Sequence, residues 1–484
     1  MPNPSGIGIK SFGAYVPPRR FSRKLIAEAN RWAFPSPKSS PKGERSVCAW
    51  DEDVITMAVE AGRDCLRDAD RDAVRGLTVA STSAPYADLS GAAIVAAALR
   101  LPRAARSREM SGSTRAGLSA LIDSCAMAGA GDQLIVASEQ RIAKPGSAQE
   151  LQYGCAAAAL LIGQGEDLVA RFLGSETVSQ PFFDHFRQSG SDFDYQWEDR
   201  WIRDEGVLKF VPETLAILSK RLGFEASEIA YFGHCGGSRG ADALVARRLG
   251  IEPERVLPNL QDRVGDTGAA HPLLMLASAL ERAKPGDKIV IVSFAHGCEI
   301  VVFEKGDISG SGTRRGVEQS IANRIEETAY LKLLSFDRQV DLDWGMRAEV
   351  DNKTALTQLY RTADQSLGFV GGRCSACEAV QFPSLPTCVN CGAADTQRPY
   401  PLADEPAQIA TFTADWLQYS PAPPLYMGLI QFDCGARILM EIVDVGPTGI
   451  DVGTPLKASF RIKERDRLRG FARYFWKASP AIAG

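Results

Sequence analysis

The sequence predicts a chain of two parts: a layered α/β region over residues 1–305, followed by a small metal-binding segment and an all-β barrel. Three observations predict this fold class. Short β-branched runs alternate with helical stretches up to residue 305. Two closely spaced pairs of cysteines follow within residues 374–391. Beyond residue 394, strand-like runs are separated by turn residues.

The composition is that of a folded enzyme with several domains. The chain has 484 residues, which suggests two to four domains of roughly 150 residues each. It is 45% hydrophobic and 24% charged, and this excludes a disordered, collagen-like or coiled-coil chain. Its formal net charge of −4 predicts no general attraction to nucleic acid or to an anionic membrane.

No apolar run approaches the length of a membrane span. The longest candidates, residues 91–99 and 155–163, cover about nine residues, whereas a span needs about 20. The first residues also lack the apolar core of a secretory signal. We therefore expect a cytoplasmic protein without a membrane partner, whose cysteines are mostly reduced.

The first half of the α/β region is predicted to cover residues 1–170. Its strands are expected at residues 77–82, 134–140 and 158–163, where β-branched runs end in small or polar residues. Residues 54–67 lie before the first of these strands. Their apolar residues recur at steps of three and four, which predicts an amphipathic helix.

A second half with a similar pattern is predicted over residues 171–305. Its strands are expected at residues 229–234, 289–296 and 299–304. The first two strands of each set have nearly the same separation, and each set follows a helix and a short acidic turn. We interpret this as an internal repeat of two similar halves.

Residues 306–370 are predicted to be a linker with a helical segment. The stretch 306–316 is rich in Gly and Ser, which favours a loop, and residues 351–366 read as a polar helix. A zinc ribbon is expected at residues 371–393 and a small barrel at residues 394–484. The predicted barrel strands are 410–418, 425–432, 437–443 and 455–462.

The paired cysteines predict a structural metal site. Two Cys-x2-Cys turns lie ten residues apart, so four thiolates can converge on one tetrahedral ion. A closed site of four cysteines is structural rather than catalytic. Zinc is the expected ion, and iron in its place or idle thiols are the alternatives. The ligands are Cys374, Cys377, Cys388 and Cys391.

A zinc ribbon beside a small barrel also suggests nucleic-acid binding. A run of basic residues precedes several aromatic residues, a combination that can form a platform for single strands. One alternative is a solvated basic edge above ordinary core aromatics, and another is a patch for the phosphates of a carrier thioester. Glu464 and Asp466 interrupt the run and weaken the nucleic-acid hypothesis. The residues are Arg461, Lys463, Arg465, Arg467, Arg469, Phe471, Tyr474, Phe475 and Trp476.

Several motifs in the first 305 residues, taken in order, resemble one family. They are residues 80–86 followed by 94–99, the turn 113–117 (STRAG), the loop 233–235 (GHC), the loop 265–267 (GDT), and residues 284–287 and 294–297. Together they resemble the thiolase superfamily, in the branch of archaeal-type HMG-CoA synthases and ketoacyl-ACP synthase III. Residues 340–484 resemble the zinc-ribbon and OB-fold domain that accompanies many thiolase-type enzymes as a separate subunit.

This resemblance implies a fold, a substrate class and partners. The implied fold is a duplicated thiolase fold with αβαβα layers, followed by the ribbon and an OB-fold barrel. The implied substrate is an acyl thioester of coenzyme A or of a carrier, and the implied assembly is a homodimer. The fused domain would bridge enzymes or help to hold the CoA moiety. A nucleic-acid partner is therefore not expected.

The chain departs from the family at three functional positions. The nucleophilic cysteine of the family corresponds to Thr114, its catalytic glutamate to Thr82, and its asparagine to Asp266. The HMG-CoA synthase reaction is therefore not expected. Thr114, His234 and Asp266 would nevertheless supply a hydroxyl, an imidazole and a carboxylate, the group types of a Ser-His-Asp triad.

Each of these residues also has a structural interpretation. Thr114 could only shape the pocket, His234 could be a satisfied buried histidine, and Asp266 could cap a helix that begins at residues 267–270. His271 and His296 are expected in loops near the same cavity. Cys235 and Cys298 also lie in these loops, but neither occupies the nucleophile turn.

The predicted function is an acyl-CoA-dependent acyltransferase that makes or breaks a carbon–carbon bond beside the thioester carbonyl. His234 would act as acid/base or polarise the carbonyl, and Asp266 would orient His234 or act as the base. Gly117, Gly297 and His296 are the predicted substrate-contacting residues, with main-chain N–H groups that bind an oxyanion. Two alternatives remain: a retro-aldol or retro-Claisen lyase without an acyl-enzyme, and a non-catalytic thioester-binding scaffold.

Overall fold

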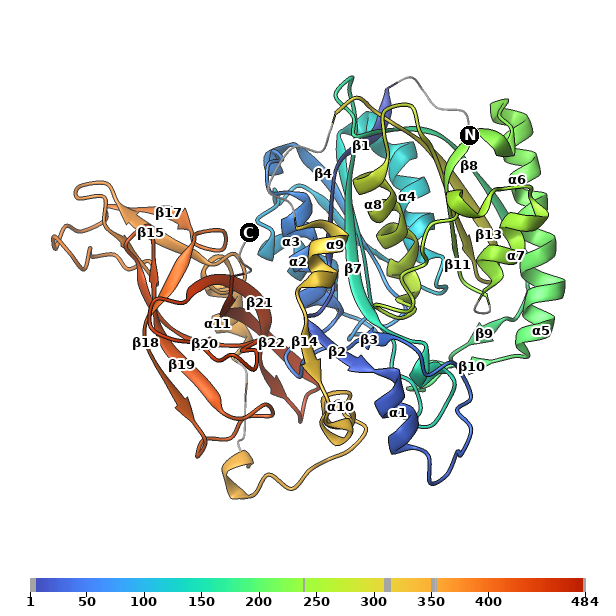
Figure 1. Cartoon of the computed structure of the whole chain (residues 1–484). Helices are drawn as coiled ribbons and strands as arrows, with labels where there is room; N and C mark the ends of the chain where they lie inside the picture. The colour runs from blue at the N-terminus through green and yellow to red at the C-terminus, as the bar shows by residue number, and fades with distance from the viewer. Residues whose placement is uncertain (1–5, 238–239, 309–314, 350–352, 354, 482–484) are drawn as a thin grey trace. The chain divides into compact units, whose positions relative to one another are not determined.

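The computed structural model describes residues 6–237, 240–308, 315–349, 353 and 355–481. The chain divides into two compact units, coloured along the chain in Figure 1. Unit 1 comprises Met1–Val47, Met57–Ala96 and Leu101–Tyr330. Unit 2 comprises Cys48–Thr56, Ala97–Arg100 and Leu331–Gly484. Most of the predicted Gly/Ser-rich stretch, residues 309–314, lies outside the described residues.

A mixed sheet forms the frame of unit 1. In the described part of the chain it has nine strands in the order β11-β12-β13-β8-β1-β7-β6-β4-β5. The strands are β1 (Ile7–Tyr15), β4 (Val74–Ala80), β5 (Arg106–Met110), β6 (Asp132–Gln140), β7 (Cys155–Gln164), β8 (Ala170–Ser179), β11 (Ile229–Cys235), β12 (Lys288–Phe294) and β13 (Gly297–Lys305).

The two halves of this sheet repeat one pairing pattern. In the first half β4 pairs with β6 in parallel, β6 with β7 antiparallel, and β7 with β1 antiparallel. In the second half β11 pairs with β12 in parallel, β12 with β13 antiparallel, and β13 with β8 antiparallel. Strands β1 and β8 join the halves. The predicted duplicated α/β fold is confirmed.

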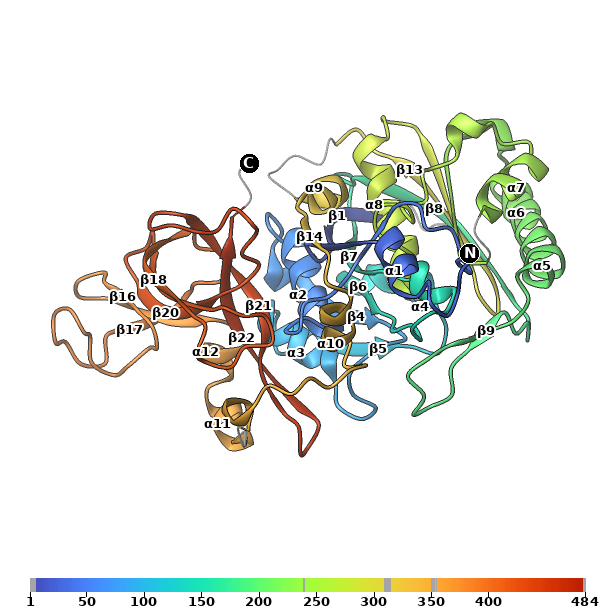
Figure 2. The ribbon, with the colours of Figure 1, turned by 60° about the horizontal axis from the view of Figure 1, so that its bottom comes forward.

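Helices cover both faces of the sheet in layers. Helices α4 (Ala116–Met127) and α8 (His271–Arg282) lie in the centre, where α4 contacts both β6 and β13 and α8 contacts both β7 and β12. Helices α6 (Leu208–Leu222) and α7 (Ala241–Arg248) pack against the second half of the sheet. Figures 1 and 2 show α4 and α8 on one side of β8 and α6 on the other. Helix α2 (Val54–Cys65) packs against β1, where Gly13 has no room for a Cβ.

Shorter elements complete the chain outside the large sheet and the barrel. The remaining α-helices of the described residues are α1 (Arg23–Ala29), α3 (Gly91–Ala98), α5 (Asp199–Trp201), α9 (Gly316–Ala322), α10 (Tyr330–Phe336), α11 (Leu356–Arg361) and α12 (Ala363–Ser366). The described strands are β2 (Arg19–Ser22), β3 (Glu44–Ser46), β9 (His185–Phe186), β10 (Tyr195–Gln196) and β14 (Ile325–Glu327). No helix in the described ranges is both long and apolar enough to cross a bilayer.

Some predicted boundaries differ from the structure for local reasons. The strand predicted at residues 289–296 ends at Phe294, because Ala295 and His296 form the turn into β13. The helix predicted at residues 351–366 is two short helices, α11 and α12, while residues 350–352 and 354 lie outside the description.

Unit 2 contains a ribbon and a barrel. The ribbon sheet has the order β16-β15-β17, with β15 (Val370–Cys374), β16 (Val380–Gln381) and β17 (Gln397–Pro401). A closed barrel follows in the order β18-β19-β20-β22-β21 (Figure 2). Its strands are β18 (Ala407–Asp415), β19 (Leu425–Phe432), β20 (Arg437–Ile442), β21 (Pro455–Asp466) and β22 (Phe471–Pro480). The predicted barrel is confirmed.

Two of the aromatic residues and one arginine at the end of the chain belong to the barrel core, while Lys463, Arg467 and Arg469 are exposed. Tyr474 and Trp476 are only 3% and 1% exposed. Arg461 is also buried, and its guanidinium forms ion pairs with Glu52 at 3.1 Å and Asp444 at 2.6 Å. The buried side chains of Arg461, Tyr474 and Trp476 therefore stabilise unit 2 and are not available for stacking with bases.

Candidate functional site

The four paired cysteines form a site that fits a tetrahedral metal ion. Their sulfur atoms all lie within 4.8 Å of one another, with Cys374 and Cys391 at 3.8 Å and Cys377 and Cys388 at 3.7 Å. Four sulfurs about 2.3 Å from a zinc ion would be about 3.8 Å apart along the tetrahedron edges. The donor set therefore fits Zn²⁺.

The chain around these cysteines forms two matching turns. Glu378 N–H donates to the carbonyl of Cys374, and Gly392 N–H donates to the carbonyl of Cys388. Ala376 N–H donates to the sulfur of Cys374 at 3.4 Å, and the Asn390 side-chain amide donates to the sulfur of Cys377 at 3.5 Å. Donors of this kind stabilise thiolates in the metal-bound state. With four protein ligands the site is closed, so its role is structural.

The predicted nucleophile turn lies at the start of α4. Thr114 is half-buried just before the helix, and the Ser113 carbonyl accepts the N–H of Ala116. Gly117 is buried so tightly that a Cβ there would overlap the carbonyl oxygen of Ala269. Among the described residues, none forms a hydrogen bond with the Thr114 hydroxyl. The turn therefore presents this hydroxyl without a base.

His234 is a buried histidine with one ring nitrogen unsatisfied. It lies in β11 and is 5% exposed, and its Nε2 has no hydrogen-bond partner among the described residues. Burial lowers its pKa to about 4, against a smaller opposite effect from the charge of Asp242. The ring is therefore neutral at pH 7. A buried polar atom without a partner is unusual in native proteins and marks His234 as a functional candidate.

Asp266 lies one residue before Thr267, the N-cap of the 3-10 turn that follows it. Its Oδ1 accepts the N–H of Gly268 at 2.9 Å, at the start of the 3-10 turn Gly268–Ala270. Its Oδ2 lies 3.8 Å from Nη1 of Arg141, and the side chain remains 27% exposed. In the described part of the chain, no hydrogen bond or ion pair joins Asp266 to His234 or Thr114. The predicted triad is therefore not assembled by direct contacts.

Three other residues near these loops have structural roles. The ring of His271 is satisfied on both sides, by the Thr267 hydroxyl at 3.1 Å and the Asn259 carbonyl at 2.8 Å. Burial raises the pKa of Cys298 to about 12 and also raises that of Cys235. Neither thiol is therefore a thiolate at neutral pH, as expected for cysteines outside the nucleophile turn.

Glu139 is a buried carboxylate beside the site that was not predicted from the sequence. It is fully buried on β6, and its carboxylate accepts hydrogen bonds from the Ser81 hydroxyl, the Thr82 N–H and hydroxyl, the Ser83 hydroxyl and the Ala269 N–H. A charged residue inside the apolar run of residues 134–140 was the available signal. Glu139 ties the ends of β4 and β6 to the turn before α8.

His296 is the centre of a second cluster beside the nucleophile turn. It forms the tip of the β12–β13 hairpin, and its Nδ1 lies 3.3 Å from the Ser113 hydroxyl. Its Nε2 lies 2.6 Å from the carbonyl oxygen of His185, and its main-chain N–H donates to Asp184 at 3.0 Å. Gly297, the next residue, has a φ of 125° and no space for a Cβ beside Val178.

Asp184 and His185 complete this cluster and were not predicted as site residues. His185 Nδ1 lies 2.7 Å from Oδ2 of Asp184. The rings of His185 and His296 stack with centroids 5.0 Å apart. Both residues follow β8, and His185 is the first residue of the short strand β9. The adjacent aspartate and histidine at residues 184–185 were the only signal in the sequence.

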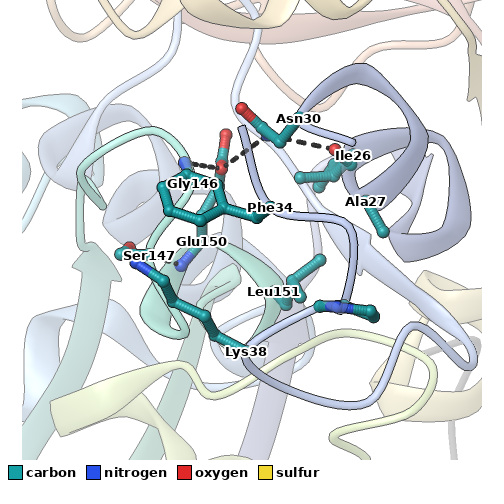
Figure 3. Close-up of a pocket in the computed structure, with 10 residues that line it drawn as sticks. Ile26, Ala27, Asn30, Phe34, Lys38, Gly146, Ser147, Glu150 and Leu151 are labelled. Carbon is teal, nitrogen blue, oxygen red and sulfur yellow. Dashed lines mark hydrogen bonds between the residues drawn. The ribbon is translucent and has the colours of Figure 1, made fainter. Parts of the chain in front are cut away.

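A small, open hollow lies elsewhere in unit 1 (Figure 3). Phe34 and Lys38 are among the residues that line it, with the Lys38 ammonium 4.0 Å from the centre of the Phe34 ring. Beside them, Glu150 accepts hydrogen bonds from Gly146 N–H and the Asn30 amide. No candidate catalytic residue lies among those that line the hollow.

Comparisons with known proteins match both parts of the chain. A model of the C-terminal region of 3-oxoacyl-[acyl-carrier-protein] synthase III matches residues 220–303. A model of the ChsH2 rubredoxin-like zinc ribbon domain matches residues 361–397. The predicted zinc ribbon is thereby confirmed.

Curated relatives are similar over most of their own length. The hydroxymethylglutaryl-CoA synthase of Methanopyrus kandleri is 31% identical over 299 residues, which are 60% of this chain and 85% of the relative. The corresponding enzyme of Aeropyrum pernix is 28% identical over 363 residues, which are 73% of this chain and 97% of the relative.

A solved structure agrees at the level of the fold. An HMG-CoA synthase complexed with CoA matches with a TM-score of 0.60 and 18% identity, over 72% of this chain and 94% of its own. The predicted resemblance to the thiolase superfamily is confirmed.

Proposed function

We propose, from the premise that this chain belongs to the hydroxymethylglutaryl-CoA synthase family of thiolase-like proteins, that it acts on acyl thioesters of coenzyme A. The proposed reaction makes or breaks a carbon–carbon bond beside the thioester carbonyl, or transfers the acyl group. The hydroxymethylglutaryl-CoA synthase reaction is not proposed. Thr114 and Thr82 stand where the family resemblance places a thiolate and a carboxylate, and neither residue can replace them directly.

The unsatisfied ring nitrogen of His234 carries this proposal. A buried polar atom without a partner destabilises the free protein by about 1–3 kcal/mol. A thioester oxygen that accepts an N–H from Nε2 would remove this penalty on binding. Because the ring is neutral at pH 7, it can polarise the carbonyl by a hydrogen bond and can take up or return a proton.

The remaining predicted residues have supporting roles in this proposal. Main-chain N–H groups near Thr114 and Gly297 would bind the enolate or oxyanion, helped by the N-terminal end of α4. Gly117 lets α4 lie close to the Ala269 main chain, and His296 lines the site from the hairpin. Asp266, whose carboxylate is partly exposed and not bonded to His234, would act as the base towards substrate.

A lyase reaction without an acyl-enzyme is the second candidate. Thr114 has no base within hydrogen-bonding distance among the described residues, which favours a reaction in which this hydroxyl is not acylated. A β-hydroxy or β-keto acyl thioester can be split by acid/base chemistry and enolate stabilisation alone. A thioester-binding scaffold without turnover is the third possibility for the same site.

Chromatography of CoA esters after incubation with the pure protein tests these functions. The panel contains acetyl-CoA, 3-hydroxyacyl-CoA and 3-ketoacyl-CoA esters. We expect His234→Gln to lower kcat/KM by about 10²–10⁴-fold, and the exposed control Lys220→Gln to match the wild type. Unchanged turnover in His234→Gln would refute its role. Binding without turnover by the wild type would identify a scaffold.

The assembly and the compartment are proposed on separate grounds. A homodimer through the thiolase-like unit follows from the family resemblance, and light scattering of the purified protein would measure it. Buried free cysteines, among them Cys65, Cys125 and Cys155, are compatible with a reducing cytoplasm.

A further inference from the structure

We propose that Ser113, the residue before Thr114, is the acyl acceptor of this site, with His296 as its general base and Asp184 as the carboxylate that positions and stabilises the imidazole. The proposal rests on the proposed action on acyl-CoA and names the residues that would carry a covalent step. It moves the nucleophile by one residue from the position that the family resemblance indicates.

The hydrogen bonds of His296 fix which ring nitrogen is free to accept a proton. Its Nε2 lies 2.6 Å from the His185 carbonyl oxygen, which has no proton to donate, so Nε2 carries the ring hydrogen. In the neutral ring Nδ1 then has a free lone pair. This atom lies 3.3 Å from the Ser113 hydroxyl. A distance of this length is usual for a catalytic pair before substrate binds.

Asp184 lies near Nε2 of the His296 ring, whereas Ser113 lies near Nδ1. Its Oδ1 lies 3.6 Å from His296 Nε2 and accepts the main-chain N–H of His296. Burial acts to raise the pKa of Asp184, but the hydrogen bonds from the His185 ring and the His296 main chain help to lower it overall. An ionised carboxylate at this place stabilises the imidazolium that forms when the ring takes a proton.

The unusual backbone conformation of His296 supports a functional role for this residue. Its φ is 52°, in the left-handed region that residues with a Cβ seldom adopt. The ring and the main-chain N–H are both held by the segment that contains Asp184 and His185. Strained backbone that is held by several contacts is frequent at active sites.

The hydroxyls of Ser113 and Thr114 differ in their hydrogen-bond partners. Ser113 and Thr114 are both half-buried, so both are open to a substrate. Only the Ser113 hydroxyl faces a ring nitrogen, while the Thr114 hydroxyl has no hydrogen bond among the described residues. A hydroxyl needs such a base because its own pKa is far above neutral.

The covalent step is an acyl transfer from sulfur to oxygen. Ser113 Oγ attacks the thioester carbonyl carbon while its proton passes to His296 Nδ1. The carbon–sulfur bond then breaks, and the departing CoA sulfur takes the proton from Nδ1. The products are an ester on Ser113 and free CoA thiol. Water attacks the ester in the same way, with its proton passing through Nδ1, and releases the carboxylic acid and the serine.

Mass spectrometry with a rapid acid quench tests this assignment. The wild type is mixed with acetyl-CoA, octanoyl-CoA or palmitoyl-CoA, digested with trypsin, and the peptide of residues 109–115 is fragmented. We expect the acyl group on residue 113 in the wild type and in the control Ser111→Ala, whose changed residue is exposed in the same peptide. We expect none in Ser113→Ala. Ser113→Cys should accumulate an adduct that hydroxylamine removes.

The rate of CoA release separates this proposal from the proposed function. We expect His296→Gln to slow CoA release about 10²–10⁴-fold with little change in KM, and Thr114→Ala to keep the adduct on residue 113. An adduct on Thr114, or Ser113→Ala turnover within twofold of the wild type, would overturn the assignment while leaving the proposed function intact. Turnover without an adduct in both the wild type and Ser113→Cys would also overturn the assignment of Ser113 and leave the proposed function intact. If the wild type releases no CoA from any ester, both the assignment of Ser113 and the proposed function are wrong.

Discussion

The Thr82 hydroxyl donates a hydrogen bond to Glu139 over 3.1 Å, so a carboxylate lies beside the position where the family resemblance places one. This carboxylate comes from β6 and not from the end of β4. The N–H groups of Thr82 and Ala269 also donate to it. Because its oxygens are occupied by these donors, Glu139 connects three segments and is not available as a base towards substrate.

Glu139→Gln should therefore destabilise unit 1. An amide in place of the carboxylate presents its own donors to the N–H and hydroxyl groups that surround it, and leaves at least one of them without an acceptor. We expect the free energy of unfolding in urea to fall by about 1–3 kcal/mol. Glu166→Gln, at an exposed position in the turn after β7, is the control. Equal stability of the two variants would contradict the role given to Glu139.

Removal of the metal should disorder the ribbon. The ribbon strands β15, β16 and β17 are short, so the segment lacks a core large enough to fold without its ion. We expect one zinc ion per chain by elemental analysis. After chelation or in Cys388→Ser, proteolysis should begin between residues 371 and 393. Protection of this segment in the metal-free protein would contradict a structural role of the metal.

Arg461→Ala should destabilise unit 2 far more than a change at a neighbouring exposed arginine. The guanidinium of Arg461 is buried between the carboxylates of Glu52 and Asp444. Removing one partner of such a cluster leaves buried charges uncompensated, which costs about 3–5 kcal/mol. Arg467→Ala, at an exposed position, should have an effect below about 0.5 kcal/mol. Denaturation curves of the two variants would measure the difference.

The strands and helices that could be predicted have sequence patterns that lie within a few neighbouring residues. The strand predicted at residues 425–432 coincides with β19, because its alternation and turn residues lie within a few positions. Strand β22 was not predicted, although Ala472, Tyr474 and Trp476 are buried and alternate with less buried neighbours. Its aromatic residues beside a basic run suggested a nucleic-acid platform, and this obscured the period of two.

The parts of the site that were not predictable depend on contacts between distant residues. His296 meets Asp184 across 112 positions of the chain and Ser113 across 183. The motif at residues 113–117 locates the turn, but which of two adjacent hydroxyls faces a histidine depends on the hairpin that brings His296 there. The same holds for residues 48–56, whose membership of unit 2 follows from partners near residue 461.

The buried state of His234 predicts a dependence of stability on pH. Its pKa in the folded protein is about 4, below its ordinary value of 6.5, so between these values the unfolded chain binds a proton that the folded chain does not. This contribution to stability is complete above pH 6.5 and is lost as the pH falls towards 4. The loss is roughly 3 kcal/mol over this range, at about 1.4 kcal/mol per pH unit.

His234→Gln should remove this contribution, because glutamine does not titrate. We expect the difference in free energy of unfolding between the wild type and His234→Gln to decrease steadily from pH 6.5 to pH 4. Comparing the two proteins cancels the other titrating groups, including His271, whose pKa burial also lowers. A difference that stays constant over this range would mean that the His234 ring is as easily protonated in the folded protein as in the unfolded chain. That result would contradict the lowered pKa of His234 and the burial that causes it.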